Sequence, residues 1–80
     1  MNAAKRQLIQ SWIDKASHDL GAARILAASA EPVLDVAIYH CQQAAEKAVK
    51  AFLVFCDEDV IETHNIPLLI EIATEHVPPA

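Results

Sequence analysis

Glycine, aromatic residues and basic residues are all scarce in this sequence, and each shortage excludes a class of protein. Glycine occurs once in 80 residues, so no glycine-rich loop is present to hold a phosphate group. Aromatic residues make up 5%, which favours helices packed closely through Ala, Leu, Ile and Val over folds that need large rings. Six Lys and Arg stand against eleven Asp and Glu, and the net charge of −5 disfavours a broad grip on a nucleic-acid backbone.

Cysteine and long apolar runs are scarce as well. Cys41 and Cys56 fall in one predicted helix, separated by about 22 Å, which is too far for a disulfide. We expect both to be small buried residues in a reducing compartment. No apolar stretch approaches the roughly 18 residues that span a bilayer, and the interleaved charges of residues 1–15 are unlike a secretory signal. We therefore expect a cytoplasmic protein with no membrane partner.

The length and the apolar content together indicate one small helical domain over residues 1–80. The hydrophobic fraction of 54% is above the usual globular share, and no repeat or linker divides the chain. A chain this short buries only about 60% of the surface that its unfolded form exposes, so its stability is marginal without help. We therefore expect additional partners.

Apolar residues at helical spacing predict three helices. The first covers residues 7–28, and the second begins with Pro32 in its first turn and ends at residue 55 or 56. The third follows Asn65 as its cap, has Pro67 in its first turn, and ends at Pro78. The short connection after residue 28 makes the two long helices antiparallel neighbours, so the predicted fold class is all-α, an up-and-down antiparallel bundle. Gly21 weakens the first helix and is interpreted as a close helix contact.

The second predicted helix carries two rows of mostly apolar side chains spaced four residues apart. The first row is Val33, Ala37, Cys41, Ala45, Val49 and Leu53, and the second is Val36, His40, Ala44, Ala48, Phe52 and Cys56. Each step along a row advances about 40° around the helix, so five steps sweep about 200°. One neighbouring helix cannot cover that width, and we expect another chain or further helices to cover the rest.

Polar residues offer few candidates for chemistry. On the first helix, side chains four residues apart predict the ion pairs Asp14–His18 and Lys15–Asp19. The second helix also has a polar side, which consists of Gln42, Gln43, Glu46, Lys47 and Lys50. We interpret this side as solvated surface. The alternative is that it forms hydrogen bonds to a partner helix or to a nucleotide. Glu46 and Lys50 have the favourable i,i+4 spacing.

Neither the histidines nor the acidic residues predict a metal site or another cofactor. His40 and Cys41 are adjacent, so they point about 100° apart on a helix and are poorly placed to bind one ion. We expect His40 to be hydrogen-bonded within a mostly buried face and His64 to hold the turn before the third helix. The acidic run 57–59 lacks the other ligands of a calcium loop and is interpreted as solvated.

Three segments together resemble the HEPN domain family, the higher eukaryotes and prokaryotes nucleotide-binding domain. They are residues 37–53, AIYHCQQAAEKAVKAFL, residues 63–69, THNIPLL, and five positions of the first helix, Trp12, Ala16, Asp19, Leu20 and Ala23. The resemblance is strongest over residues 12–70. It implies a bundle of four or five helices that commonly dimerises, so this chain is similar to an incomplete bundle that is truncated at the C-terminus.

The resemblance also implies what such a protein does. Many members are metal-independent RNases that pair an arginine with a histidine four to six residues later, across the dimer interface, and use the RNA 2′-hydroxyl. Members are often encoded beside a minimal nucleotidyltransferase (MNT) as a toxin and antitoxin pair. Here Arg6 and Arg24 are the only arginines, and neither has such a histidine. No catalytic residue is therefore carried over.

We accordingly expect a homodimerising interaction module, with an MNT-type nucleotidyltransferase as a further partner, rather than an enzyme. One alternative is an RNA-cleaving or nucleotide-binding enzyme whose site forms at an oligomer interface, and another is a gene fragment without function. The positions that match the family motifs are the candidate nucleotide-binding or partner-binding residues: Asp19, His40, Gln42, Gln43, Glu46, Lys47 and His64.

Overall fold

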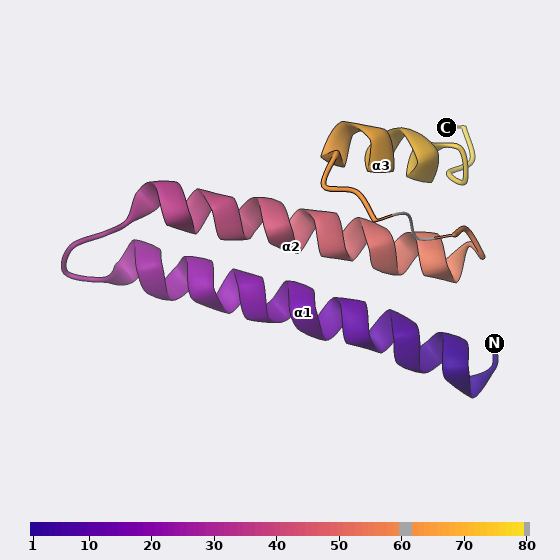
Figure 1. The fold of residues 1–80 in the computed structure, drawn as a ribbon, viewed down its shortest axis with the longest axis horizontal. Helices are drawn as coiled ribbons and strands as arrows, with labels where there is room; N and C mark the ends of the chain where they lie inside the picture. The colour runs from indigo at the N-terminus through magenta and orange to yellow at the C-terminus, as the bar shows by residue number, and fades with distance from the viewer. Residues whose placement is uncertain (60–61, 80) are drawn as a thin grey trace.

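The computed structural model describes residues 1–59 and 62–79, and within them the chain forms three helices and no strand. The helices are α1 (Ala3–Ala28), α2 (Leu34–Phe55) and α3 (Ile66–Thr74). α1 and α2 form an antiparallel hairpin, and α3 packs on the C-terminal half of α2 (Figure 1). The molecule is elongated, with extents of 44 × 28 × 26 Å. The prediction of an all-α fold with two long helices and a short third is confirmed.

The helix boundaries follow local capping signals, and two of them differ from the prediction. The side chain of Asn2 accepts a hydrogen bond from the Lys5 N–H at 2.8 Å, so α1 begins at Ala3 rather than at residue 7. α2 begins at Leu34, which leaves Pro32 in the connection rather than in the first turn. The predicted cap of α3 is confirmed, because the Asn65 side chain accepts from the Leu68 N–H at 3.1 Å. α3 ends at Thr74, before the prolines.

The end of α2 is closed by a residue in the left-handed region. Asp57 has φ of 61°, and its N–H donates to the Val54 carbonyl at 3.0 Å. The next N–H, of Glu58, donates to the Leu53 carbonyl at 2.9 Å, which completes a Schellman motif. Asp57 is exposed, as expected of this acidic turn, and it pairs with Lys5 at 2.8 Å. The turn therefore ties the end of α2 to the start of α1.

The two long helices contact each other through residues that alternate three and four positions apart, which we call the inner strip. All its members are buried or half-buried: Ile9, Trp12, Ala16, Asp19, Ala23 and Leu26 on α1, and Ala37, His40, Ala44, Lys47, Ala51 and Val54 on α2. This spacing is that of a coiled-coil seam. The alanines allow the two backbones to approach closely, because a methyl side chain takes little room between helices.

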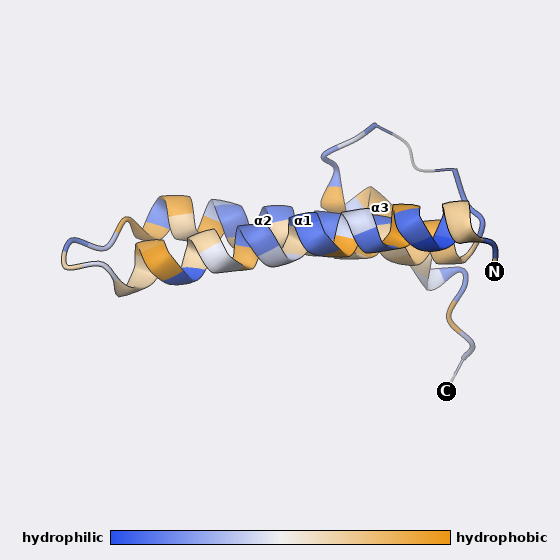
Figure 2. Ribbon diagram, turned by 90° about the horizontal axis from the view of Figure 1, so that it is seen from below, coloured by the Kyte–Doolittle hydropathy of each residue, from blue (hydrophilic) through white to orange (hydrophobic). Residues whose placement is uncertain are grey.

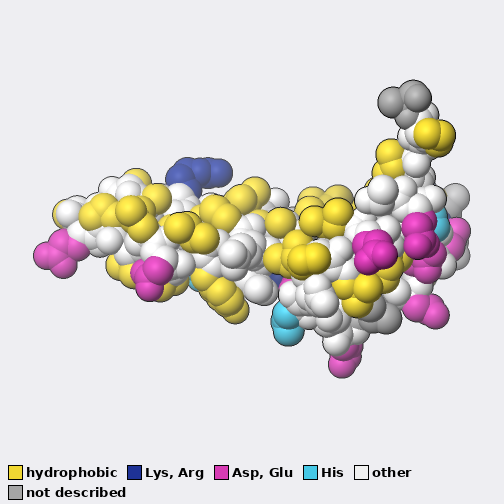
Figure 3. Space-filling model, turned by 90° about the horizontal axis from the view of Figure 1, so that it is seen from above, with side chains coloured by type: hydrophobic (Ala, Val, Ile, Leu, Met, Phe, Trp, Pro, Cys, Tyr) yellow, Lys and Arg dark blue, Asp and Glu magenta, His cyan; other side chains and the backbone are white. Residues whose placement is uncertain are grey.

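A second strip with the same alternating spacing runs along α2 and is left uncovered, and we call it the outer strip. It consists of Leu34, Ile38, Cys41, Ala45, Ala48 and Phe52, of which all but the half-buried Phe52 are exposed. Figure 2 shows strongly hydrophobic residues recurring along α2, and Figure 3 shows hydrophobic side chains spread over the arm of the hairpin beyond α3.

The structure tests three predictions about burial and close packing. Cys41 is exposed and Cys56 half-buried, so the expectation of two buried cysteines is wrong. The two four-residue rows are only partly buried, as their width predicts: such a row drifts around the helix, whereas a contact between near-antiparallel helices follows alternating steps of three and four. A Cβ built on Gly21 would meet no atom within 4 Å, so this glycine marks no close helix contact.

Candidate functional site

The structure brings five of the seven candidate residues together in two clusters. Asp19, His40 and Lys47 meet in the inner strip, and we call them the Asp19 cluster. Glu46 and His64 meet where the loop before α3 crosses α2. The two glutamines join neither cluster: Gln42 lines a hollow beside α3, and Gln43 is half-buried on α2.

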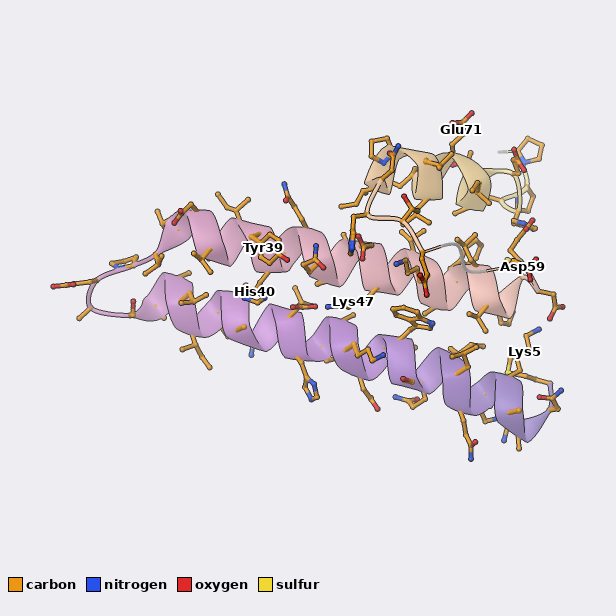
Figure 4. All side chains as sticks on the ribbon, in the orientation of Figure 1. Lys5, Tyr39, His40, Lys47, Asp59 and Glu71 are labelled. Carbon is orange, nitrogen blue, oxygen red and sulfur yellow. The ribbon has the colours of Figure 1, made fainter. Side chains whose placement is uncertain are left out.

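The Asp19 cluster joins the two long helices near the middle of the hairpin. Asp19 comes from α1, and its side chain is only 11% exposed. His40 and Lys47 lie about two turns apart on α2, so both point to the same side of that helix (Figure 4). The Nδ1 of His40 is 2.8 Å from Oδ1 of Asp19, and the Nζ of Lys47 donates to Oδ2. Each carboxylate oxygen therefore has its own donor.

These donors determine the charge state of Asp19. Burial alone would raise the pKa of Asp19, but the hydrogen bonds from Lys47 and His40, together with their positive charges, lower it below its ordinary value. The carboxylate is thus ionised at neutral pH. Since an ionised carboxylate only accepts hydrogen bonds, Nδ1 of His40 carries the proton of this contact. The prediction that His40 is hydrogen-bonded within the packed face of α2 is confirmed.

The same geometry leaves the other ring nitrogen of His40 available. Nε2 has no hydrogen-bond partner among the described residues, and the His40 side chain is 29% exposed. An imidazole whose Nδ1–H is oriented by a carboxylate presents Nε2 as a base when the ring is neutral. The ring also contacts Tyr39 edge-on, with 5.5 Å between centroids. This arrangement is suited to accepting a proton from a bound hydroxyl.

Both ion pairs predicted on α1 are wrong. Asp19 pairs across the hairpin rather than with Lys15, whose ammonium lies 4.9 Å from the centre of the Trp12 ring. Asp14 accepts from Gln10 at 2.9 Å instead of pairing with His18. The i,i+4 rule treats a helix in isolation, and here partners on α2 compete successfully for Asp19 because it faces that helix.

A second group of charges, which we call the Glu46 cluster, lies where α2 meets the loop before α3. Its members are Glu46, Lys50 and His64. Glu46 accepts from Lys50 at 3.4 Å and from Nδ1 of His64 at 3.0 Å. The side chains of Glu46 and Lys50 are only 3% and 7% exposed, so the i,i+4 pair is confirmed but its solvated position is wrong. Lys50 also lies 5.2 Å from the Trp12 ring, which completes its surroundings with a cation–π contact.

His64 connects this buried pair to the segment that carries α3. Its side chain is 84% exposed, and its contact with Glu46 is made through Nδ1. The turn beside it is held separately, because the Asn65 N–H donates to Oγ1 of Thr63 at 3.1 Å. Farther along α3, Leu69 is fully buried, as is Leu53 of α2. The segment that carries α3 is therefore held by a polar contact through His64 and by the burial of the apolar side chain of Leu69.

Lys50 and Trp12 are members of this arrangement that the sequence analysis did not select as site residues. The spacing places Lys50 on the polar side with Glu46, and nothing in that spacing distinguishes a buried ion pair from a solvated one. Trp12 is the single tryptophan of the chain, and its place in the alternating pattern of α1 was an available signal. Tryptophan is the aromatic side chain that attracts a cation most strongly, so a tryptophan in the inner strip is suited to contact a buried ammonium.

The hollow beside α3 is mostly apolar. It has a volume of about 580 Å³ and is lined by Ile38, Cys41, Gln42, Ala45, Ile66 and Pro67, with His64 and Asn65 at the start of α3. Within residues 1–59 and 62–79, no group of three or more His, Cys, Asp or Glu is placed to hold a metal ion. In the same part of the chain, no helix has the length and apolar character needed to cross a membrane.

We predict that Asp19→Asn lowers the free energy of unfolding at pH 7 by roughly 1 to 3 kcal/mol, because an amide has a single oxygen to accept from the Lys47 ammonium and the His40 ring, and its NH2 group must face one of these two donors. The folded pKa of Asp19 lies below its unfolded value, so its contribution is complete above the unfolded pKa, about 4, and is lost as pH falls through the folded pKa. Urea unfolding of both proteins from pH 7 to pH 2.5 measures this. The exposed Asp14→Asn is the control, and an undiminished difference at pH 2.5 would contradict the prediction.

For the Glu46 cluster, we predict that Glu46→Leu destabilises the protein by about 3 kcal/mol, because it leaves the Lys50 ammonium buried without a counter-ion. Adding Lys50→Met should restore most of this loss, since two apolar side chains then fill the space. Urea unfolding of the single and double variants compares them. A double variant as unstable as Glu46→Leu alone would show that the burial of Lys50 is not the cause.

Comparison with known proteins adds one finding to this geometry. A family model described as the HEPN domain matches residues 9–80, a region that contains both clusters and all of α2 and α3. No curated protein and no solved structure matches the chain significantly. Because the family model covers most of the chain, this protein belongs to the HEPN domain family.

Proposed function

We propose that this HEPN-domain protein acts by association, as a dimerising and interaction module of the kind found in toxin and antitoxin pairs with MNT-type nucleotidyltransferases. The observation that carries the proposal is the uncovered outer strip of α2. Leu34 and Ile38 in this strip are 58% and 59% exposed. Exposed apolar side chains that form one continuous row are typical of a contact surface, whereas isolated ones are common on any protein.

The area of the molecule supports the same proposal. The accessible surface of 5643 Å² exceeds by about 900 Å² the roughly 4,700 Å² expected for a compact monomer of this mass. A stable protein interface buries about 800 Å² on each partner. The excess surface is therefore of the size that one interface would cover.

The charges of α2 support it as well. Lys47 pairs with Asp19, and Glu46 pairs with Lys50 and His64, so the charged residues of this part of α2 are engaged within the chain. The outer strip itself contains none. Such a surface gains most from burying apolar area against another apolar surface. The nucleotidyltransferase partner rests on family membership, and the strip is where we place its contact or that of a second copy.

The direct test is a charge placed in the outer strip. We expect the wild-type protein to sediment as a dimer and Ala45→Glu to sediment as a monomer with unchanged helix content, because an unpaired carboxylate at the centre of the contact is costly to bury. Ser11→Glu, an exposed position on the far side of α1, is the matched control and should leave the dimer intact. A wild-type protein that is a well-folded monomer with cooperative melting would refute the proposal.

A second candidate function is RNA cleavage or nucleotide binding at a site completed by a second chain. The observation that favours it is the Asp19–His40 pair, in which Nε2 of His40 is available to accept the proton of a ribose 2′-hydroxyl. The attacking oxygen would then displace the 5′-oxygen of the next nucleotide. This candidate requires another group to protonate that leaving oxygen, which a partner chain would supply.

RNA incubation separates the two candidates. If association is the function, wild type, His40→Ala and His64→Ala should all leave RNA at the background rate of cleavage. If the second candidate holds, His40→Ala should lower the rate by about 100-fold or more, because general-base catalysis contributes about that much. His64→Ala compares the other candidate histidine, whose Nδ1 contacts Glu46 rather than the Asp19 cluster, and it should retain the rate if His40 is the base.

A further inference from the structure

α2 has three contact directions, and the structure fills two of them. The inner strip faces α1, and Glu46 meets His64 of the segment that carries α3. The outer strip lies between these two sides. Apolar hollows flank it along its length: one contains Leu34, Ile38 and Cys41 together with residues of α1, and another contains Ala48 and Phe52 together with residues of α3. A helix placed on the outer strip would therefore enter a groove walled by α1 and α3.

The sizes of the side chains along the outer strip indicate how such a helix crosses it. The small residues, Cys41, Ala45 and Ala48, lie next to one another, and the large ones lie on either side of them, Leu34 and Ile38 toward one end and Phe52 at the other. Two helices that cross at an angle are closest at the crossing point and diverge on both sides. A strip with small side chains at the crossing point and large ones toward both ends therefore fits a partner helix with the same distribution of side-chain sizes.

Antiparallel pairing of two identical outer strips satisfies every position. Cys41 meets Ala45 of the second copy, Ile38 meets its Ala48, and Leu34 meets its Phe52, and the twofold axis repeats each contact. All six residues are then paired. A shift by one heptad in either direction leaves two of the six without a partner, so the spacing favours a single register.

Charge restricts the part of the surface at which two copies can meet. Each chain carries a net charge of −5, so two copies repel each other over most of their surfaces. The outer strip has no charged residue, and the middle of α2 uses Glu46, Lys47 and Lys50 inside the chain. The strip itself offers no counter-charge to a charged partner, although Arg24 of α1 lines one of the flanking hollows, and an identical strip meets no repulsion there.

We propose that two copies of this protein pair through their α2 helices, antiparallel, with Cys41 of one copy against Ala45 of the other. This inference rests on the proposed association and specifies its partner, surface and register. The interface joins apolar side chains along about 27 Å of α2 in each copy. The two copies together form a bundle in which each α2 is enclosed by its own α1 and α3 and by the other α2.

Cysteine cross-linking between two different variants tests the register. The first variant is Cys56→Ala, whose single thiol is Cys41. The second combines Cys41→Ala, Ala45→Cys and Cys56→Ala, so that its single thiol is at position 45. In the proposed dimer the thiols at 41 and 45 of different copies face each other. In a dimer of two copies of the same variant, the two thiols are displaced from each other by four residues, or about 6 Å along the helix axis. Together with the separation of the two helices, this displacement puts the Cα atoms farther apart than a disulfide allows.

The expected result is about tenfold more disulfide-linked dimer in an equal mixture than in either variant alone, after exchange of subunits and mild oxidation, because only the mixture has the disulfide geometry. Cross-linking of each variant by itself would indicate a parallel pair and overturn the proposal. A dimer by sedimentation without cross-linking in the mixture would overturn this register and leave the association standing. A monomer whose Cys41 reacts freely with a maleimide would overturn both and assign the strip to another protein. Circular dichroism verifies that both variants fold.

Discussion

Pairing of the buried Asp19 carboxylate across the hairpin is the constraint on which the rest of the structure depends. A carboxylate in a strip of alanines is costly unless it is charged and fully hydrogen-bonded, and His40 and Lys47 provide one donor to each of its oxygens. Sliding one helix by a turn would separate the three groups. The cluster thus selects one register between α1 and α2, as a polar residue does in a coiled coil.

This register determines which sides of α2 remain for other contacts. With His40 and Lys47 directed at α1, Glu46 meets His64 of the segment before α3, and Lys50 contacts both Glu46 and the Trp12 ring of α1. The remaining side is the outer strip, which carries no charge. The polar residues of α2 therefore organise the fold of the single chain, and the apolar residues left over are available for association.

The sequence was sufficient to predict the helices and the excess width of the apolar surface of α2. Asn65 and Pro67 identified the start of α3, because capping acts through neighbouring residues. Local spacing could not show that Glu46 and Lys50 are buried, or that the partners of Asp19 lie on another helix, because those contacts join residues 18 to 28 positions apart. Cys41 was assigned to the buried side because four-residue rows do not show which of two apolar strips meets α1.

Association through the outer strip makes the stability of the fold depend on protein concentration. Thermal unfolding at concentrations a hundredfold apart measures this directly, because a folded dimer that melts to two unfolded chains is stabilised by mass action, by up to about 2.7 kcal/mol over that range. The account predicts a Tm that rises by several degrees with concentration. A cooperative transition with the same Tm at every concentration would contradict it.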